Sequence, residues 1–456
     1  MVVYDSKTLE EKELDILRKA VDIAEKRAAK KTILSPEIKD IIVIVEDFLK
    51  ERDLICYGGT AINNILPSSD QFYNRDIEIP DYDFYSPQAL KDAKDLADIY
   101  FKKGYNEVEA KAGVHPGTFK VFVNYIPVAD ITHLESSLFN AVLSNALKIN
   151  NIYYAPPNFL RMSMYLELSR PEGMVSRWEK VLKRLILLNK NYPLEGKNCI
   201  HEDFMRTFEG NKSSEEKIYN IVKDNFIDQE LVFFGGYACT LYGKYMPKKH
   251  RRILDSVPDF DVLSETPHKS AYLVKKILIK NGIDKVKVYK KTGIGEIIAA
   301  HYEIRVGRET VAFIYEPLAC HSYNIIQIDK KDVKVATIDT MLSFYLAFLY
   351  ANRVYYDYNR IICMAEYLFM VQAKNRLKQR GLLKRFSLNC YGKQTTLNTM
   401  RNEKSLKFKE LKNKKNRAEY DYYFLRYIPT GKSNTNDTKT NKRIKKNKGT
   451  KKHKKT

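Results

Sequence analysis

The chain contains an internal duplication, and this duplication limits its possible architectures more than any other pattern. One apolar stretch ends in Gly58-Gly59 and a similar one ends in Gly235-Gly236. At nearly equal separations there follow Pro80-Asp81-Tyr82-Asp83 in the first copy and Pro258-Asp259-Phe260-Asp261 in the second. A compound pattern that recurs along a chain indicates a repeated structural unit. We therefore predict two related α/β modules in tandem.

Each copy shows the same order of expected elements: a strand, a glycine turn, a helix, an aspartate-bearing strand, a helix and two further strands. Helices precede the first copy and follow each copy, so the fold class is α/β of the mixed α+β kind. The expected divisions are an N-terminal helical segment (1–52), a first module (53–190), a second module with helices (191–375), a basic extension (376–430) and a Lys-rich tail (431–456).

Three aspartates in the first copy are candidate catalytic and metal-binding residues. Asp81 and Asp83 are two residues apart on an expected strand, so their side chains point to one face. Asp130 lies inside the otherwise apolar Val128-Ala129-Asp130-Ile131, where a buried carboxylate needs a partner. An exposed strand with an ordinary D-x-D pattern is the alternative. Two carboxylates about 4 Å apart repel by roughly 4 kcal/mol at an effective dielectric constant of about 20. We therefore expect two Mg²⁺ or Mn²⁺ ions between the three aspartates.

The turn upstream supplies the second part of this predicted site. A strand that ends in Gly58-Gly59 and opens a helix at Thr60 presents backbone N–H groups to a phosphate. We expect Gly58, Gly59 and Thr60 to bind a nucleotide. Together with the metal ions, this arrangement is suited to an in-line phosphoryl displacement.

The second copy lacks one of these groups. Aligning the last strands places Val311-Ala312-Phe313-Ile314 on Val128-Ala129-Asp130-Ile131, so Phe313 replaces the third carboxylate. Glu316 would substitute only in a register shifted by three residues, which would put it on the opposite face of the strand. We predict that the second module is catalytically inactive.

The net charge of the chain is +22 and its hydrophobic content is 44%. Residues 431–456 contribute about +10, since they hold eleven Lys/Arg and one Asp, and they have too few apolar residues to fold alone. The remaining body carries about +12, which indicates a polyanionic partner such as nucleic acid or an anionic membrane. A solubilising surface is the alternative. For the tail we expect a nuclear signal, an RNA tether or a packaging element.

The cysteines and the apolar runs bear on the compartment. No two of the six cysteines have metal-ligand or redox spacing, so we expect buried, reduced thiols. The N-terminus has no apolar signal region, and no stretch of about 20 residues is apolar and uncharged. We therefore expect neither secretion nor a transmembrane segment.

These motifs resemble a known superfamily. The glycine turn, Asp81-x-Asp83 and Asp130 are similar to the signature of the polymerase β nucleotidyltransferases, with a longer loop between turn and aspartates. YGGTAIN, PDYDFYS and PVADIT, together with a degenerate second copy, resemble the catalytic subunit of viral poly(A) polymerases of the poxvirus, giant-virus and African swine fever virus type. The resemblance covers roughly residues 35–370.

The resemblance implies template-independent addition of AMP from ATP to RNA 3′ ends, with Mg²⁺ or Mn²⁺. It also implies RNA and ATP as partners, a homodimer as in the giant-virus relatives, no membrane partner, and a location in the host cytoplasm, at viral factories, or in the virion. Two alternatives stay open: another RNA or tRNA terminal nucleotidyltransferase, and a non-catalytic RNA-binding scaffold.

Further cations are candidates for binding the triphosphate or the RNA. Lys180 and Lys183 lie on an expected helix after the first module, sharing one face with Arg184, and Arg177 precedes them. A helix in this position often supplies cations to the triphosphate, and a solvated basic face is the alternative. Arg161 is a weaker candidate of the same kind. A basic loop with interleaved tyrosines is a candidate for stacking on single-stranded RNA; it contains Tyr242, Lys244, Tyr245, Lys248, Lys249, Arg251 and Arg252.

Overall fold

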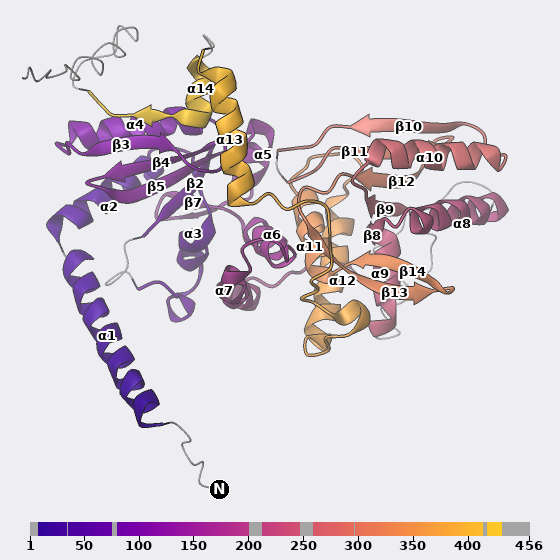
Figure 1. Ribbon diagram of the computed structural model, residues 1–456, viewed down its shortest axis with the longest axis horizontal. Helices are drawn as coiled ribbons and strands as arrows, with labels where there is room; N and C mark the ends of the chain where they lie inside the picture. Colours follow the sequence, from indigo (N-terminus) through magenta and orange to yellow (C-terminus); the bar gives the residue numbers. More distant parts are fainter. Residues whose placement is uncertain are drawn as a thin grey trace, which may run out of the picture.

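Two α/β modules lie side by side in the computed structural model, each built on one mixed eight-stranded sheet (Figure 1). The structure describes residues 8–33, 35–74, 80–199, 212–246, 259–295, 297–413 and 417–430. The tail from residue 431 and most of the basic loop, residues 247–258, lie outside these ranges.

The elements before residue 192 are α1 (Leu9–Ile33), α2 (Pro36–Lys50), β1 (Ile55–Cys56), α3 (Gly58–Ile65), β2 (Tyr82–Ser86), α4 (Ala89–Lys102), β3 (Val108–Ala112), β4 (Thr118–Val123), β5 (Ile126–His133), α5 (Ser136–Leu143), β6 (Leu147–Ile149), β7 (Ile152–Tyr154), α6 (Pro157–Leu168) and α7 (Trp178–Asn191). The following elements are α8 (Lys212–Asp228), β8 (Val232–Phe234), α9 (Gly235–Tyr242), β9 (Phe260–Leu263), α10 (Pro267–Lys280), β10 (Val286–Lys291), β11 (His301–Val306), β12 (Glu309–Tyr315), β13 (His321–Ile328), β14 (Lys331–Ala336), α11 (Ile338–Phe348), α12 (Tyr358–Asn375), β15 (Cys390–Tyr391), α13 (Leu397–Leu411), α14 (Arg417–Phe424) and β16 (Arg426–Tyr427).

The two sheets share the order of seven strands, and the eighth strand is added at opposite edges. Their orders are β16-β3-β4-β5-β2-β1-β7-β6 and β10-β11-β12-β9-β8-β14-β13-β15. In both, the aspartate strand (β2 or β9) has two neighbours. It is antiparallel to the strand before the glycine turn (β1 or β8) and parallel to the strand that carries Asp130 or Phe313 (β5 or β12). The duplication predicted from the sequence is therefore present in the structure, and the expected fold class is confirmed.

Two hairpins were not predicted. The first, β6–β7, lies in a region expected to be helical, and the second is β13–β14. Each turns on two residues with positive φ, Asn150-Asn151 in the first and Asp329-Lys330 in the second. Such turns match the twist of paired strands, and Asn and Asp tolerate this backbone conformation, so Asn150-Asn151 was an available turn signal.

Helices α2 and α4 cover one face of the first sheet. Helix α2 is capped by Ser35, whose Oγ accepts from the N–H of Ile38 at 3.2 Å. On β2, Tyr82 donates to Glu46 of α2, and the Phe84 ring lies 6.2 Å from that of Phe48. Since side chains alternate along a strand, Asp81 and Asp83 point to the opposite face, which α2 and α4 leave uncovered.

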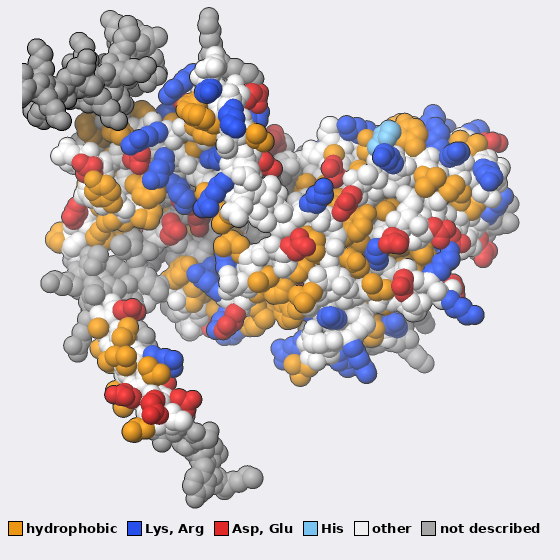
Figure 2. All heavy atoms as spheres, viewed as in Figure 1, with side chains coloured by type: hydrophobic (Ala, Val, Ile, Leu, Met, Phe, Trp, Pro, Cys, Tyr) orange, Lys and Arg blue, Asp and Glu red, His pale blue; other side chains and the backbone are white. Residues whose placement is uncertain are grey.

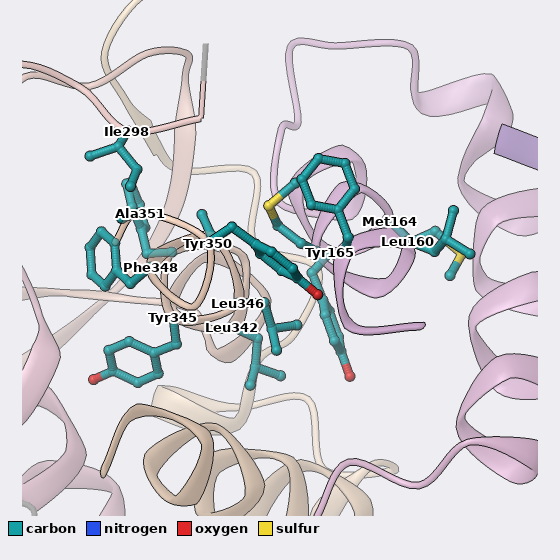
Figure 3. Packing of buried hydrophobic residues seen from close by; sticks show 14 of the residues in the cluster. Leu160, Met164, Tyr165, Ile298, Leu342, Tyr345, Leu346, Phe348, Tyr350 and Ala351 are labelled. Atoms are coloured by element: carbon teal, nitrogen blue, oxygen red, sulfur yellow. The ribbon is translucent and has the colours of Figure 1, made fainter. Parts of the chain in front are cut away.

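The modules meet through two equivalent helices, each of which follows the parallel strand beside the glycine-turn strand. Helix α6 of the first module packs against α11 of the second, and every residue of α11 is buried. Figure 3 shows this contact, with Leu160 and Met164 on the α6 side and Leu342 and Leu346 on the α11 side. A helix that is apolar on all sides requires cover on all sides, which neighbours from both modules supply here.

The C-terminal extension (376–430) connects both modules. Its β15 adds a strand to the β13 edge of the second sheet, and its β16 adds one to the β3 edge of the first. Between the two modules, Arg385 of the extension pairs with the fully buried Asp339 of α11, with N···O distances of 2.7 and 3.0 Å. This pairing compensates for the burial of the carboxylate.

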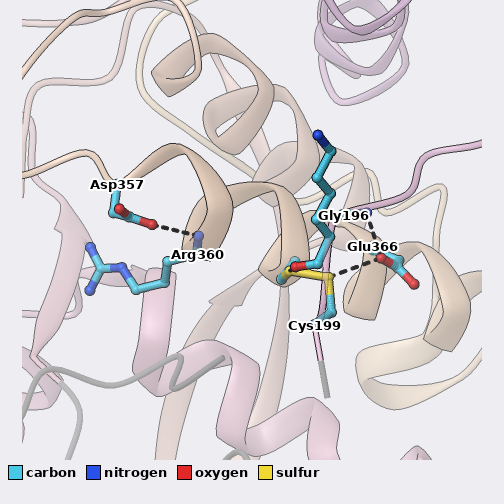
Figure 4. Close-up of a disulfide and its surroundings, with 7 residues drawn as sticks. Gly196, Cys199, Asp357, Arg360 and Glu366 are labelled. Atoms are coloured by element: carbon cyan, nitrogen blue, oxygen red, sulfur yellow. Dashed lines mark hydrogen bonds between the residues drawn. A yellow bond between two sulfur atoms is a disulfide. The ribbon is translucent and has the colours of Figure 1, made fainter. Parts of the chain in front are cut away.

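The prediction of reduced cysteines is wrong for four of the six. Disulfides join Cys199 to Cys363 and Cys320 to Cys390, pairs that are 164 and 70 residues apart in the sequence. The first lies beside α12, where the Gly196 N–H donates to Glu366 at 2.8 Å (Figure 4). Local spacing cannot reveal such pairs, because the fold brings them together. The remaining two, Cys56 and Cys239, are buried free thiols as expected.

Helix α1 projects away from the first module (Figure 1). It exposes several apolar residues, including Leu14, Leu17 and Val21, and Figure 2 shows hydrophobic side chains along it.

None of the described helices combines the length and the apolar composition needed to cross a lipid bilayer.

Candidate active site

Strand pairing places the three predicted carboxylates on one face of two neighbouring strands. Strands β2 and β5 are parallel neighbours, and their register places Asp83 directly opposite Asp130. Asp81 immediately precedes β2. Because it is two residues before Asp83, its side chain points to the same face. All three side chains therefore lie on the sheet face that α2 and α4 leave uncovered.

The carboxyl groups perturb one another. The pKa of Asp83 is raised to about 7, first by burial and then by the charges of Asp81 and Asp130. The pKa of Asp81 is also raised, by burial and by the charge of Asp130. The cations Lys120 and Arg177 oppose the rise at Asp83. This environment favours the uptake of a proton or of a further cation.

Asp130 is satisfied on one side only. One of its carboxylate oxygens pairs with Lys120 of the neighbouring strand β4, and the other, Oδ1, is buried with no hydrogen-bond partner among the described residues. A buried carboxylate oxygen without a partner is costly, so an additional ligand is expected there.

The glycine turn is fitted to Asp83. Gly58 has a φ of +71°, and a Cβ at this position would lie 2.7 Å from Asp83 Oδ2. The N–H of Tyr57 donates to the carbonyl of Asp83 at 2.9 Å, and Thr60 Oγ1 donates to the carbonyl of Asp81 at 2.6 Å. The first turn of α3 therefore lies against the carboxylates, and Thr60 holds the backbone of Asp81.

Arg184 of α7 is the cation that lies at this turn. A Cβ at Gly59 would lie 3.0 Å from both Nη atoms of Arg184 and 2.4 Å from the hydroxyl of Tyr73. Arg184 Nη2 also donates to that hydroxyl at 2.5 Å. The main-chain N–H groups of Phe72 and Tyr73 both donate to Asn63 of α3 at 2.8 Å. The loop between glycine turn and aspartates thus helps to position Arg184.

The other predicted cations lie elsewhere on or near α7. Lys183 is exposed and pairs with Glu179, whereas Lys180 is exposed on the same helix and its charge acts on Glu167. Arg177 pairs with Glu167 at 3.0 Å, and its charge reaches Asp83. The helical spacing identified the basic face correctly, but it did not show which member of that face would reach the glycine turn.

Arg161 does not face the site, contrary to expectation. It is fully buried between α6 and α7, where it donates to Asn158, to Asn189 and to the carbonyl of Tyr192. Likewise, Tyr242 of the basic loop is buried and donates to the carbonyl of Ala336 at 2.9 Å, so its ring is not available to a base.

The donor set fits hard divalent cations. Its ligands are oxygens only, and Asp83 and Asp130 are partly buried. Mg²⁺ and Mn²⁺ prefer carboxylate oxygens, and a cation would both oppose the mutual repulsion and satisfy Asp130 Oδ1. Asp81, Asp83 and Asp130 are thus the residues that would hold these ions.

We expect the stability of the metal-free protein to fall as pH rises from 3.8 to about 7, the interval over which the pKa of Asp83 is raised. The folded chain holds the Asp83 proton up to about pH 7, whereas the ordinary carboxyl pKa is 3.8. Between these values unfolding releases a proton, so the free energy of unfolding decreases with rising pH. Metal binding needs the ionised form, so Mn²⁺ should raise Tm more at pH 8 than at pH 5.

Thermal unfolding of the wild type beside Asp83→Asn measures both effects, because the variant lacks the titrating carboxyl group. A wild-type Tm that rises with pH relative to the variant would contradict the assignment. An equal Mn²⁺ shift at both pH values would contradict it as well.

The second module repeats the glycine turn and the aspartate strand but lacks the third carboxylate. Gly235 has a φ of +72° and would place a Cβ 1.9 Å from Asp261 Oδ2, as Gly58 does with Asp83. The register pairs Asp261 with Phe313, which confirms that Phe313 occupies the position of Asp130. Phe313 is buried and stacks on Tyr355, with ring centroids 5.3 Å apart. Aromatic packing thus fills the place of the third carboxylate.

Comparisons with known proteins agree with this geometry. Residues 43–174, which include the glycine turn and all three carboxylates, match the profile of a family described as the poly(A) polymerase catalytic subunit. A putative poly(A) polymerase catalytic subunit of Acanthamoeba polyphaga mimivirus is 32% identical over 191 residues, which are 41% of this chain and 32% of the relative. One of African swine fever virus (strain Badajoz 1971 Vero-adapted) is 32% identical over 178 residues, 38% of this chain and 36% of the relative.

The similarity in sequence thus spans about a third of the length of these curated relatives. The similarity in structure is more extensive. The crystal structure of the Megavirus polyadenylate synthase superposes with a TM-score of 0.75 and 19% identity, over 90% of this chain and 85% of that one. The predicted resemblance is confirmed for the segment that carries the site, and the fold is confirmed for nearly the whole chain.

Proposed function

We propose that this chain is a template-independent polynucleotide adenylyltransferase that adds AMP from ATP to the 3′ end of RNA. The observation that carries this proposal is the cluster of Asp81, Asp83 and Asp130 beside a glycine turn, inside the segment that matches the poly(A) polymerase catalytic subunit profile. The catalytic, metal-binding and nucleotide-binding roles of these residues are part of the proposal.

The reaction is a displacement at the α-phosphorus of ATP. The 3′ hydroxyl of the RNA releases its proton to solvent and its oxygen forms the new bond to the α-phosphorus, while the bond from that phosphorus to the α,β-bridging oxygen breaks and pyrophosphate leaves. Two divalent cations, when bound, would neutralise the carboxylates and stabilise the charge on the attacking and leaving oxygens. In this proposal Asp130 would serve the acceptor side, and Asp81 and Asp83 would hold the cation on the triphosphate at the glycine turn.

An RNA extension assay tests the proposal. The purified protein is incubated with a short RNA and each nucleoside triphosphate separately, with Mg²⁺ or Mn²⁺. Extension with ATP alone supports it. Extension with CTP or UTP as well would indicate another RNA or tRNA terminal nucleotidyltransferase. No extension with any triphosphate would favour a non-catalytic RNA-binding scaffold.

Arg184 should contribute more to ATP binding than Lys183, although both lie on the basic helix. Charged hydrogen bonds are worth about 1.5–3 kcal/mol, so Arg184→Gln should raise the KM for ATP at least about tenfold. Lys183→Gln has the same change of charge at an exposed position and should change this KM less than about twofold. Steady-state kinetics with ATP varied at saturating RNA compare them; equal effects would contradict the placement of Arg184.

We further propose that the enzyme is a homodimer and that it acts in the host cytoplasm, at viral factories, or in the virion. The exposed apolar face of α1 supports a partner for that helix. Sedimentation equilibrium of the full chain beside a Leu14→Asp/Leu17→Asp variant measures the first point, since a dimer through α1 would dissociate in the variant.

A further inference from the structure

A row of charged side chains leads from the carboxylates to the edge of the first sheet. It crosses five neighbouring strands in register: Asp83 pairs with Asp130, Asp130 with Lys120, Lys120 with Lys111, and Lys111 with Arg426. Directly paired residues share a face, so all five lie on the uncovered side of the sheet. With strands about 4.8 Å apart, the three cations extend about 10 Å from Lys120 to Arg426.

The cations of this row are accessible. The side chains of Lys120, Lys111 and Arg426 are 38%, 43% and 77% exposed. Lys120 pairs with Asp130, while Lys111 lies 4.1 Å from the centre of the Phe122 ring. In the space-filling view, Lys and Arg side chains gather over β3 and β4 (Figure 2).

One acidic residue lies beside the row. Glu109 pairs with Lys111 at 3.5 Å and with Arg426 at 3.1 Å. A phosphate that binds Lys111 and Arg426 would have to compete with the Glu109 carboxylate for these two cations.

The last cation comes from the C-terminal extension, which is fixed at this edge. Strand β16 holds Arg426 in place through the hydroxyl of Tyr427, which donates to Asp98 of α4 at 2.6 Å. The N–H of Ala112 donates to the carbonyl of Leu425 at 2.9 Å, and Lys94 pairs with Asp421 at 3.3 Å. Residues that are far from the carboxylates in sequence therefore complete the row.

The second module is an internal comparison. Its register gives the equivalent row Asp261, Phe313, Glu303, Tyr289, and β10 is the edge strand, with no counterpart of β16 among the described residues. The positions of Lys120 and Lys111 hold Glu303 and Tyr289. Among the described residues, the module that retains all three carboxylates has the cationic row, and the equivalent positions of the second module do not.

The direction of the row indicates which phosphates it would bind, those of the ATP triphosphate or those of the RNA backbone. The glycine turn and Arg184 lie on the β1 side of Asp83, and the row leaves on the β5 side, beyond Asp130. In-line displacement requires the attacking and leaving oxygens on opposite sides of the phosphorus. If the triphosphate binds at the glycine turn, the attacking RNA must therefore approach from the β5 side.

We propose that Lys120, Lys111 and Arg426 form a track for the backbone phosphates of the acceptor RNA, whose 3′ end reaches Asp130 from the β16 edge. This inference rests on the proposed function and specifies its acceptor side. Such contacts are electrostatic and independent of sequence, as template-independent extension of any RNA 3′ end requires.

The Lys111→Gln/Arg426→Gln variant tests the track, with Lys287→Gln/Lys290→Gln as the matched control. The control removes two cations from β10, the strand equivalent to β3, and leaves the row intact. Anisotropy of a labelled oligoadenylate over a salt series measures binding. We expect the track variant to bind roughly tenfold more weakly and to lose about 1.4 from the slope of log K against log salt, about 0.7 for each phosphate contact with a single strand. The control should keep the wild-type slope.

Glu109→Gln is a second variant with the opposite expected sign. It removes the competing anion, so RNA should bind about two- to threefold more tightly. Misfolding would not produce such a gain. Equal losses in track and control variants, or no gain in Glu109→Gln, would overturn the track. Because wild-type extension with ATP is measured separately, a failed track leaves the proposed function intact, whereas a wild type that binds RNA but extends none refutes the function.

Discussion

The Asp83→Asn variant should lose nucleotide transfer by about 10³-fold or more. Asp83 lies directly opposite Asp130 in the register, and its carboxylate is the one against which the glycine turn is fitted. An amide of the same size keeps the packing but removes the negative charge that holds a cation. A loss of about 4 kcal/mol of transition-state stabilisation corresponds to this factor. Single-turnover extension of a short RNA with ATP measures it.

The matched control is Asp261→Asn at the equivalent position of the second module. Because Phe313 replaces the third carboxylate there, the control should extend RNA at nearly the wild-type rate. Substantial extension by Asp83→Asn, or by Asp81→Ala, would refute a single active site. A comparable loss in Asp261→Asn would show that the second module takes part in the chemistry.

Gly58→Ala should reduce transfer by about 10²-fold while the protein still folds. A Cβ at this position would lie 2.7 Å from Asp83 Oδ2, so the carboxylate must move. The positive φ adds strain of about 1–2 kcal/mol for a residue with a side chain. Displacement of a reacting group by about 1 Å costs about 10²-fold. The measurements are kcat in RNA extension and the free energy of unfolding.

Gly104→Ala separates the two effects of that substitution. Gly104 also has positive φ, +101°, but nothing lies within 4 Å of its Cβ position. Both variants should lose a similar amount of stability, and only Gly58→Ala should lose activity. If both lose activity equally, backbone strain rather than contact with Asp83 explains the effect.

The repeated motifs were sufficient to predict the tandem architecture and the replacement of Asp130 by Phe313. Both follow from local patterns, an i, i+2 pair of carboxylates and an alignable apolar strand, which fix the face and the register. The β6–β7 hairpin was missed because short apolar runs do not separate strand from helix by periodicity alone. Its Asn150-Asn151 turn was the signal that could have identified it.

Features that depend on distant segments were not predicted. The Cys320–Cys390 disulfide, the contact of Arg184 with the glycine turn and the register of Lys111 with Arg426 each join residues far apart in the chain. No spacing rule links such residues, since the fold alone decides which of many cations reaches a given carboxylate or turn. The surplus of basic residues therefore predicted a polyanionic partner but not the side chains that would contact it.

The most direct measurement is anomalous diffraction from crystals soaked with Mn²⁺ and a non-hydrolysable ATP analogue. A divalent-cation site made by Asp81, Asp83 and Asp130 predicts Mn²⁺ peaks among these three carboxylates, with the triphosphate at the turn of Gly58, and no peak at Asp261. Crystals that bind the nucleotide but show no peak at the three carboxylates, or show one only in the second module, would contradict it.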